Sequence, residues 1–417
     1  MRLVHGPSYR DNFTVVAYTI SGVTMRNPFV RACAVIALVS PIGLNAQTRV
    51  FLVKLGSDTI DLERVVRTGN KIEGVIVRHI PTNAMLKYSI VLGKDGRVES
   101  YEQGSYRADG TPAPANAQTG AAAVGLKMTF TVDSVIREVP TSGQPVIRRT
   151  AVPKGTLPAI GGSWFATEMQ VAAARKGGKA NVIGFAANAN TATSPDIRIL
   201  GPDSAEIVNQ GFRVGVKTDK SGRLVHGDQS LTTQKYDVTV TKDVDVIALA
   251  GVWASKEVAG QAAAPTNTPD SVVATIGNAH VVILYSRPAK RGRELWGKLV
   301  PFDTTWRFGA DYATQLKTDA DLNIGGTKVA AGTYTLWLLP SQGQSYLIVN
   351  TRLQDPRDPT RRLWGTQWDP ASDIAKIPVQ KHLNLPTDEE RFHIFLDNGM
   401  LMFHWGNSGY GVSIKAN

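Results

Sequence analysis

Five side chains that can bind a ligand lie close together between positions 285 and 307. They are two aromatic residues and three arginines: Tyr285, Arg287, Arg293, Trp306 and Arg307. An arginine presents a planar fork of donors that matches a carboxylate, phosphate or sulfate, and aromatic rings offer flat walls for a sugar. The group therefore predicts a binding site for an anionic or sugar-like small molecule.

The same residues also fit a structural role. Arg307 stacked on Trp296 or Trp306, and paired with Asp303 or Asp311, would hold two loops together. Both interpretations remain open, because spacing along the chain does not say whether a guanidinium group faces solvent or an internal carboxylate.

Catalytic and metal-binding patterns are weaker. Residues 47–417 contain six histidines, which are His79, His226, His280, His382, His393 and His404. No pair has the helical two-histidine spacing of a zinc protease, and no nucleophile elbow or phosphate-binding glycine loop is present. His393 and His404 flank one predicted hairpin and could face each other, as a metal pair, as a base in a hydrolase-like enzyme or as half-exposed sheet residues. We assign no catalytic residue, no metal and no cofactor.

Several spaced motifs in residues 271–417 carry a family resemblance. They are Tyr-Ser-Arg-Pro at 285–288, Lys-Arg-Gly-Arg at 290–293, Trp-Gly at 296–297, Trp-Arg-Phe-Gly-Ala at 306–310, Ala-Gly-Thr-Tyr at 331–334 and Trp-Gly-Asn at 405–407. This part of the chain resembles the bacterial domain-of-unknown-function family 2911 (DUF2911). It departs from the usual pattern at Asp311, where the family has Asn after Gly-Ala. The resemblance implies an exported β-rich domain and brings no established reaction.

Length and composition favour two folded units. The chain has 417 residues, of which 42% are hydrophobic and 19% charged, and its formal net charge is +11. Domains usually contain about 100 to 200 residues, so two are expected. No block of like charges is present, so we expect no nucleic-acid partner.

The N-terminal segment predicts export. From Met25 the chain has a basic start, then an apolar run from Ala32 to Leu44, then Asn45-Ala46-Gln47. The run is too short to cross a bilayer of about 30 Å and is typical of a secretory signal. We interpret residues 1–46 as a leader and cleaved signal peptide. The only cysteine, Cys33, lies inside it, so we expect a periplasmic or secreted product without disulfides or a remaining transmembrane segment.

Residues 47–256 show mainly period-two alternation between glycine and aspartate turns, which predicts an antiparallel meander. One helix is expected, with Ser163 as N-cap and a body from Trp164 to Lys176, and a disordered loop is expected near 103–125. The pattern resembles half-barrel proteins of bacterial envelopes, in which a curved sheet offers an apolar face to lipids. The sheet either carries apolar cargo or packs its helix as a plain core.

Small residues and prolines at 257–270 predict a linker, and residues 271–417 then predict an antiparallel β-sandwich. Parity places Tyr285 and Arg287 on one face of a strand that Pro288 ends, so Arg287 is expected at the rim of its sheet. The overall prediction is a mainly β, two-domain envelope protein. It would bind a small molecule, glycan or lipid of the cell envelope.

Overall fold

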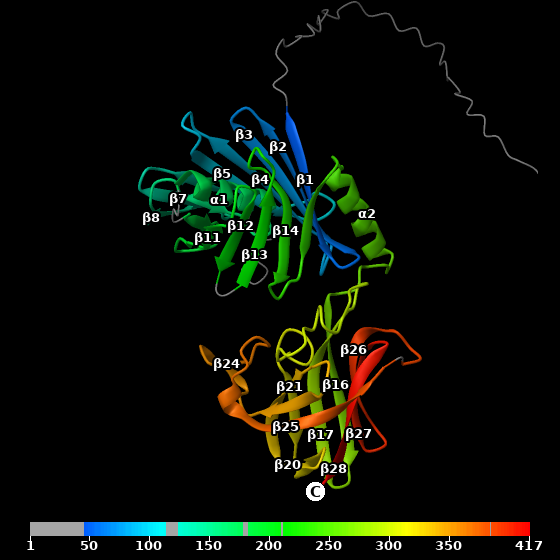
Figure 1. The fold of residues 1–417 in the computed structure, drawn as a ribbon. Helices are drawn as coiled ribbons and strands as arrows, with labels where there is room; N and C mark the ends of the chain where they lie inside the picture. Colours follow the sequence, from blue (N-terminus) through cyan, green and yellow to red (C-terminus); the bar gives the residue numbers. More distant parts are fainter. Residues whose placement is uncertain (1–45, 114–123, 178–181, 210–211, 384) are drawn as a thin grey trace, which may run out of the picture. The chain divides into compact units, whose positions relative to one another are not determined.

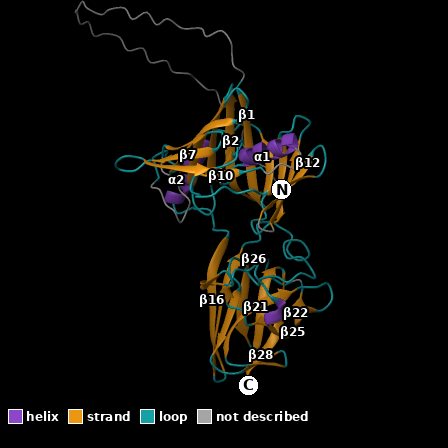
Figure 2. Ribbon diagram, turned by 90° about the vertical axis from the view of Figure 1, so that its left-hand side faces the viewer, coloured by secondary structure: helices purple, strands orange, loops and turns teal. Residues whose placement is uncertain are grey.

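The structure is a computed structural model that describes residues 46–113, 124–177, 182–209, 212–383 and 385–417. Almost all of the predicted signal peptide and the middle of the predicted loop at 103–125 lie outside these residues. The described part is mostly strand, in two large antiparallel sheets, as the sequence predicted (Figures 1 and 2). Neither described helix has the length and apolarity needed to span a bilayer.

The first sheet has 13 strands in the spatial order β11-β12-β13-β14-β15-β1-β2-β3-β4-β5-β6-β7-β8. Their bounds are β1 Gln47–Leu55, β2 Asp58–Thr68, β3 Lys71–Arg78, β4 Ala84–Leu92, β5 Val98–Tyr106, β6 Leu126–Phe130, β7 Ser134–Val139, β8 Val146–Ala151, β11 Asp196–Ile199, β12 Ser204–Asn209, β13 Phe212–Thr218, β14 Leu224–Leu231 and β15 Asp237–Thr241. Short β9 (Leu157–Ala159) and β10 (Gly184–Ala186) pair in parallel. Nearly every strand pairs with its neighbour in sequence, so the sheet is the expected meander.

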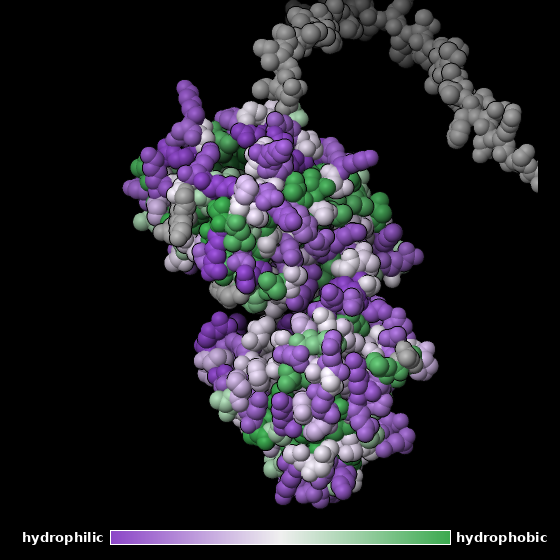
Figure 3. Space-filling view, in the orientation of Figure 1, coloured by the Kyte–Doolittle hydropathy of each residue, from purple (hydrophilic) through white to green (hydrophobic). Residues whose placement is uncertain are grey.

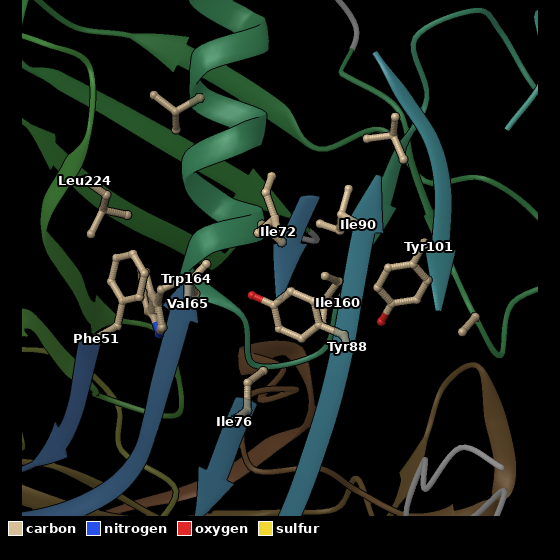
Figure 4. Close-up of a cluster of buried hydrophobic side chains, with 14 of the residues drawn as sticks. Phe51, Val65, Ile72, Ile76, Tyr88, Ile90, Tyr101, Ile160, Trp164 and Leu224 are labelled. Carbon is tan, nitrogen blue, oxygen red and sulfur yellow. The ribbon is translucent and has the colours of Figure 1, made fainter. Parts of the chain in front are cut away.

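Helix α1 (Trp164–Gly177) lies against one face of this sheet, and Figure 4 shows it above a cluster of buried side chains. That cluster includes Phe51, Tyr88 and Trp164, all at most 5% exposed. Gly227 has no side chain where the Trp164 ring lies, and a Cβ there would overlap the ring. This part of the concave interior is therefore filled core.

The start of α1 is held by two side chains. Ser163 Oγ accepts the N–H of Ala166 at 2.9 Å, which confirms the predicted N-cap. Glu63 of β2, only 1% exposed, accepts the N–H groups of Trp164 and Phe165 at 2.6 and 3.0 Å. The Ser163 and Tyr88 hydroxyls donate to its other oxygen at 2.5 and 2.6 Å. Burial raises the pKa of Glu63, and these four donors oppose the rise by stabilising the carboxylate.

A second helix, α2 (Val246–Val258), was not predicted, and it occupies the start of the predicted linker. Val246, Ala250 and Trp253 form one buried stripe that packs on the other face of the sheet, against residues such as Val50 and Met85. The sequence predicted no element in this short apolar run, whose Val and Ile residues are β-branched, although its buried residues follow helical spacing. Its N-cap is Asp245, whose carboxylate accepts the N–H groups of Ile247 and Ala248. Other apolar residues of α2 stay exposed, and hydrophobic side chains reach the visible surface of this part (Figure 3).

The second sheet has 11 strands, in the order β16-β17-β18-β21-β22-β25-β28-β19-β20 with β26 and β27 attached at β28. Their bounds are β16 Asn267–Ile276, β17 Ala279–Pro288, β18 Thr314–Thr318, β19 Leu322–Ile324, β20 Thr327–Val329, β21 Gly332–Leu339, β22 Ser345–Asn350, β25 Asp373–His382, β26 Glu389–Asp397, β27 Met400–Gly406 and β28 Ser408–Ala416. Outside it lie the hairpin β23 (Gln354–Asp355) with β24 (Asp358–Arg362), and the short 3-10 helix η1 (Pro370–Ser372). β16 begins at Asn267, which is inside the linker predicted at 257–270.

This sheet folds into two layers, which agrees with the predicted sandwich. β25 pairs with β22 through residues 373–379 and with β28 through residues 380–382, so it passes from one layer to the other. The core between the layers includes Tyr285 of β17 and Phe392 of β26, whose rings meet edge to face at 6.0 Å. β17 is an interior strand, and Val281, Ile283 and Tyr285 lie on its buried face as parity predicted.

Replacing Glu63 with glutamine keeps its size and removes two acceptor sites. The amide NH2 then faces N–H and O–H donors, so we expect the free energy of unfolding to fall by about 2 kcal/mol. Urea denaturation would measure it. Glu73→Gln is the control, because Glu73 pairs only with the exposed Lys71 and should change stability by less than about 0.5 kcal/mol. Equal losses in both variants would contradict a special role for Glu63.

Candidate functional site

The structure gives two of the predicted ligand residues internal partners. The Tyr285 hydroxyl lies 3.1 Å from Asp270 Oδ2 and accepts the N–H of Ile394 at 3.2 Å. Burial raises the pKa of Tyr285 to about 12. Arg287 donates from Nε to the Phe392 carbonyl at 3.1 Å and from Nη1 to Asp270 Oδ2 at 3.3 Å. These bonds tie β17 to β16 and β26.

The other three residues of the group behave differently from one another. Arg293 donates to the backbone carbonyls of Lys290 and Ala289 at 2.9 and 2.6 Å and so stabilises its own loop. Trp306 stacks on Trp405 with ring centroids 5.8 Å apart. Arg307 forms no hydrogen bond or direct salt bridge within the described part of the chain. Burial lowers its pKa, and the charge of Asp311, one of its two expected partners, opposes that change.

Tyr285, Arg287, Arg293 and Trp306 thus have partners within their own domain. None of the five residues lines the three cavities found in the described residues. Ligand binding at this group stays a prediction. His393 and His404 are partners in the β26–β27 register, as expected, but neither imidazole forms a hydrogen bond with these five residues in the described structure. A histidine base acting there also stays a prediction.

The half-barrel part of the chain, where the sequence left apolar cargo open, contains a cavity beside α1 with a volume of about 670 Å³, and the sequence identified none of its lining residues. One wall is apolar and comes from the strands, with Val65 of β2, Ile72 of β3 and Val98 of β5. The facing wall is the side of α1 that carries Phe165 and Met169. The α1 residues of this wall run from Phe165 to Lys176 at intervals of three or four, so the cavity lies along one side of the helix over its whole length.

Charged side chains line the exposed part of this cavity. They are five cations and two carboxylates, namely Arg49, Arg67, Arg97, Lys176, Arg223, Asp95 and Glu168. Both carboxylates are paired, Glu168 with Arg49 and Asp95 with Arg97. Among the residues that the structure describes, Arg67 donates only to the Gly69 carbonyl, and Arg223 donates from its guanidinium to Gln47 Oε1. Lys176 has no partner among the described residues.

Three cations thus lie at an apolar cavity without an ion-pair partner in the described structure. Such a site can hold an apolar chain while its cations bind an anionic group. A signal for this arrangement was present in the sequence. Arg67 precedes the β2–β3 turn, Arg97 follows the β4–β5 turn and Arg223 follows the β13–β14 turn. Every second turn of a meander lies at the same edge, so these three arginines gather there.

The comparisons with known proteins bear on the second sheet only. Residues 267–414 match the family model described as "Protein of unknown function (DUF2911)". The resemblance found in the sequence is thus confirmed for the DUF2911 domain, which contains the second sheet and less than half of the chain. No curated protein and no solved structure matches the chain. The family description names no reaction, so the chemistry rests on the residues themselves.

The internal bonds of Arg287 predict a loss of stability when it is shortened. Arg287→Ala removes a half-exposed ion pair and a bond to a backbone carbonyl, so the free energy of unfolding should fall by about 1 to 2 kcal/mol. Chemical denaturation of the variant measures this change in the free energy of unfolding. The control is Arg361→Ala, because Arg361 is 73% exposed and pairs only with its neighbour Asp358. A variant at 287 that is as stable as the control would refute the structural role.

Proposed function

We propose that this protein is an exported binding protein that holds an amphipathic molecule, with an apolar tail and an anionic headgroup, in the cavity beside α1. The observation that carries the proposal is the combination of an apolar cavity of about 670 Å³ with three cations that lack an ion-pair partner in the described residues. Cavities of about 300 to 1,000 Å³ are typical of small-molecule sites.

Export is supported by the basic and apolar segment from Met25 to Ala46. β1 begins at Gln47, the residue that follows the expected cleavage point. A lipid or other amphiphile of the cell envelope is then the natural class of ligand, because such molecules need an apolar site to pass through water.

The two parts of the ligand would meet different walls. The tail would lie between the strand wall at Val65 and Ile72 and the helix wall at Phe165 and Met169. The headgroup would lie toward Arg67, Lys176 and Arg223. Arginine binds carboxylate or phosphate with two parallel hydrogen bonds, whereas a cationic headgroup would be repelled at this edge.

A chain-length series tests the apolar wall. Alkyl sulfates of increasing length should bind more tightly by about fourfold for each added methylene, because burial of one methylene contributes about 0.8 kcal/mol, until the cavity is filled. Isothermal titration calorimetry measures these affinities and those of alkyl trimethylammonium ions with the same tail lengths. Equal affinities for the anionic and cationic series would refute the headgroup assignment.

Replacement of the three cations tests whether they bind the anionic headgroup at the edge of the cavity. The triple variant Arg67→Gln, Lys176→Gln, Arg223→Gln should weaken alkyl sulfate binding by about tenfold, and more at low than at high salt. The matched control is Lys127→Gln, Lys217→Gln, Lys242→Gln. It removes two exposed cations of the same sheet and one that directly follows β15, and none of the three lines the cavity. The control should bind like the unchanged protein, and a loss of equal size would show that only net charge matters.

A further inference from the structure

The outer face of the second layer of the DUF2911 domain carries an unusual row of side chains. In the strand register His393 of β26 pairs with His404 of β27, His404 with Gly409 of β28, and Gly409 with His382 of β25. Neighbouring residues on β27, such as Phe403 and Trp405, point into the core, so by parity the histidines face outward. Three imidazoles thus lie in one cross-strand row, and the third strand contributes no side chain.

The next row repeats the arrangement with a thioether. Met402 of β27 pairs with Gly411 of β28, and Gly411 pairs with Gln380 of β25. Because β28 has glycine in both rows, the side chains of β27 and β25 can approach each other across it. His404 Cδ2 lies 2.5 Å from where a Cβ of Gly409 would stand. Met402 Sδ and His382 Nε2 both lie beside the corresponding point of Gly411, the nitrogen at 3.1 Å.

Two of these imidazole nitrogens have no partner. The Nε2 atoms of His382 and His404 are shielded from solvent, and neither forms a hydrogen bond within the described part of the chain. Burial removes the hydrogen bonds that an imidazole nitrogen makes with water, and a nitrogen that gains no new partner destabilises the folded state. Such atoms are therefore rare in folded proteins.

We propose that His382, Met402 and His404 form a binding site for a soft monovalent metal ion, Cu(I). Two imidazoles and a thioether are ligands that Cu(I) accepts, whereas zinc sites use cysteine, histidine and carboxylate. Among the described residues no group of three or more histidines, cysteines and acidic residues is arranged to hold a metal. The third ligand is therefore the methionine, which makes the site selective for a soft ion.

His393 belongs to the same row but not to the site. Its ring lies 5.2 Å from the ring of Phe395 on its own strand, and Phe395 in turn meets His404 edge to face at 4.8 Å. His393 is on the far side of His404 from the two glycines. It therefore serves as the matched control, because it is a half-buried histidine of the same face.

The experiment uses the full chain in a Cys33→Ser background, since the thiol of the only cysteine would itself bind Cu(I). Cu(I) is titrated in competition with a chromophoric Cu(I) chelator, and Ag(I) is added as a diamagnetic probe to protein labelled at the methionine methyl groups. We expect one Cu(I) per chain and a shift of the Met402 methyl signal on addition of Ag(I). An unmoved Met402 signal at saturating Ag(I) would overturn the proposal without any further variant.

Substitutions then identify the ligands. Cu(I) binding should weaken by at least about 100-fold in each of the variants Met402→Leu, His382→Asn and His404→Asn. Loss of a residue that only hydrogen-bonds to a metal ligand weakens binding by about 10- to 100-fold, so loss of a ligand itself should have at least the larger effect. His393→Asn should leave the affinity unchanged. Equal weakening in all four variants, or Zn(II) binding as tight as Cu(I) and indifferent to Met402→Leu, would refute the site. Binding of amphiphiles at α1 is independent of these outcomes.

Discussion

A buried carboxylate determines where the helix of the first sheet lies. Glu63 stands on β2 inside the concave core and accepts hydrogen bonds from the first two N–H groups of α1 and from two hydroxyls. The first N–H groups of a helix have no partner within it and carry partial positive charge, so an ionised acceptor at this point stabilises both the helix end and the charge. The start of α1 is thereby attached to the sheet.

The helix that is attached in this way has a packed side and a side that lines a cavity. Trp164, at the first turn of α1, packs closely over Gly227, and the core is filled there. Another side of the helix, which carries Phe165, Met169 and Lys176, lines the cavity. A filled core and a cavity thus share one concave face. The filled part agrees with a sheet that packs its helix as core, and apolar cargo in the cavity stays a proposal.

In the DUF2911 domain the alternation of side chains along the strands separates an aromatic core from a row of histidines. The inner face of the second layer holds the aromatic core, in which Trp306, Phe392 and Trp405 contact one another. The outer face holds the histidines and Met402. Two of the arginines predicted as ligand residues have internal partners. Arg287 and Arg293 donate to backbone carbonyls, and Arg287 also donates to Asp270, because a guanidinium group can satisfy several acceptors at once.

The sequence by itself determined the features that depend on neighbours along the chain. Alternation predicted the meander and the interior strand β17, Ser163 predicted the start of α1, and a set of spaced motifs identified the DUF2911 domain. It missed α2, since a short apolar run with β-branched residues fits either a strand or a helix until a packing partner is known. Tertiary structure alone decided the rest. Arg67 and Lys176 meet at one cavity, and His382 and Met402 meet over Gly411, only because strands far apart in the chain are brought together in register.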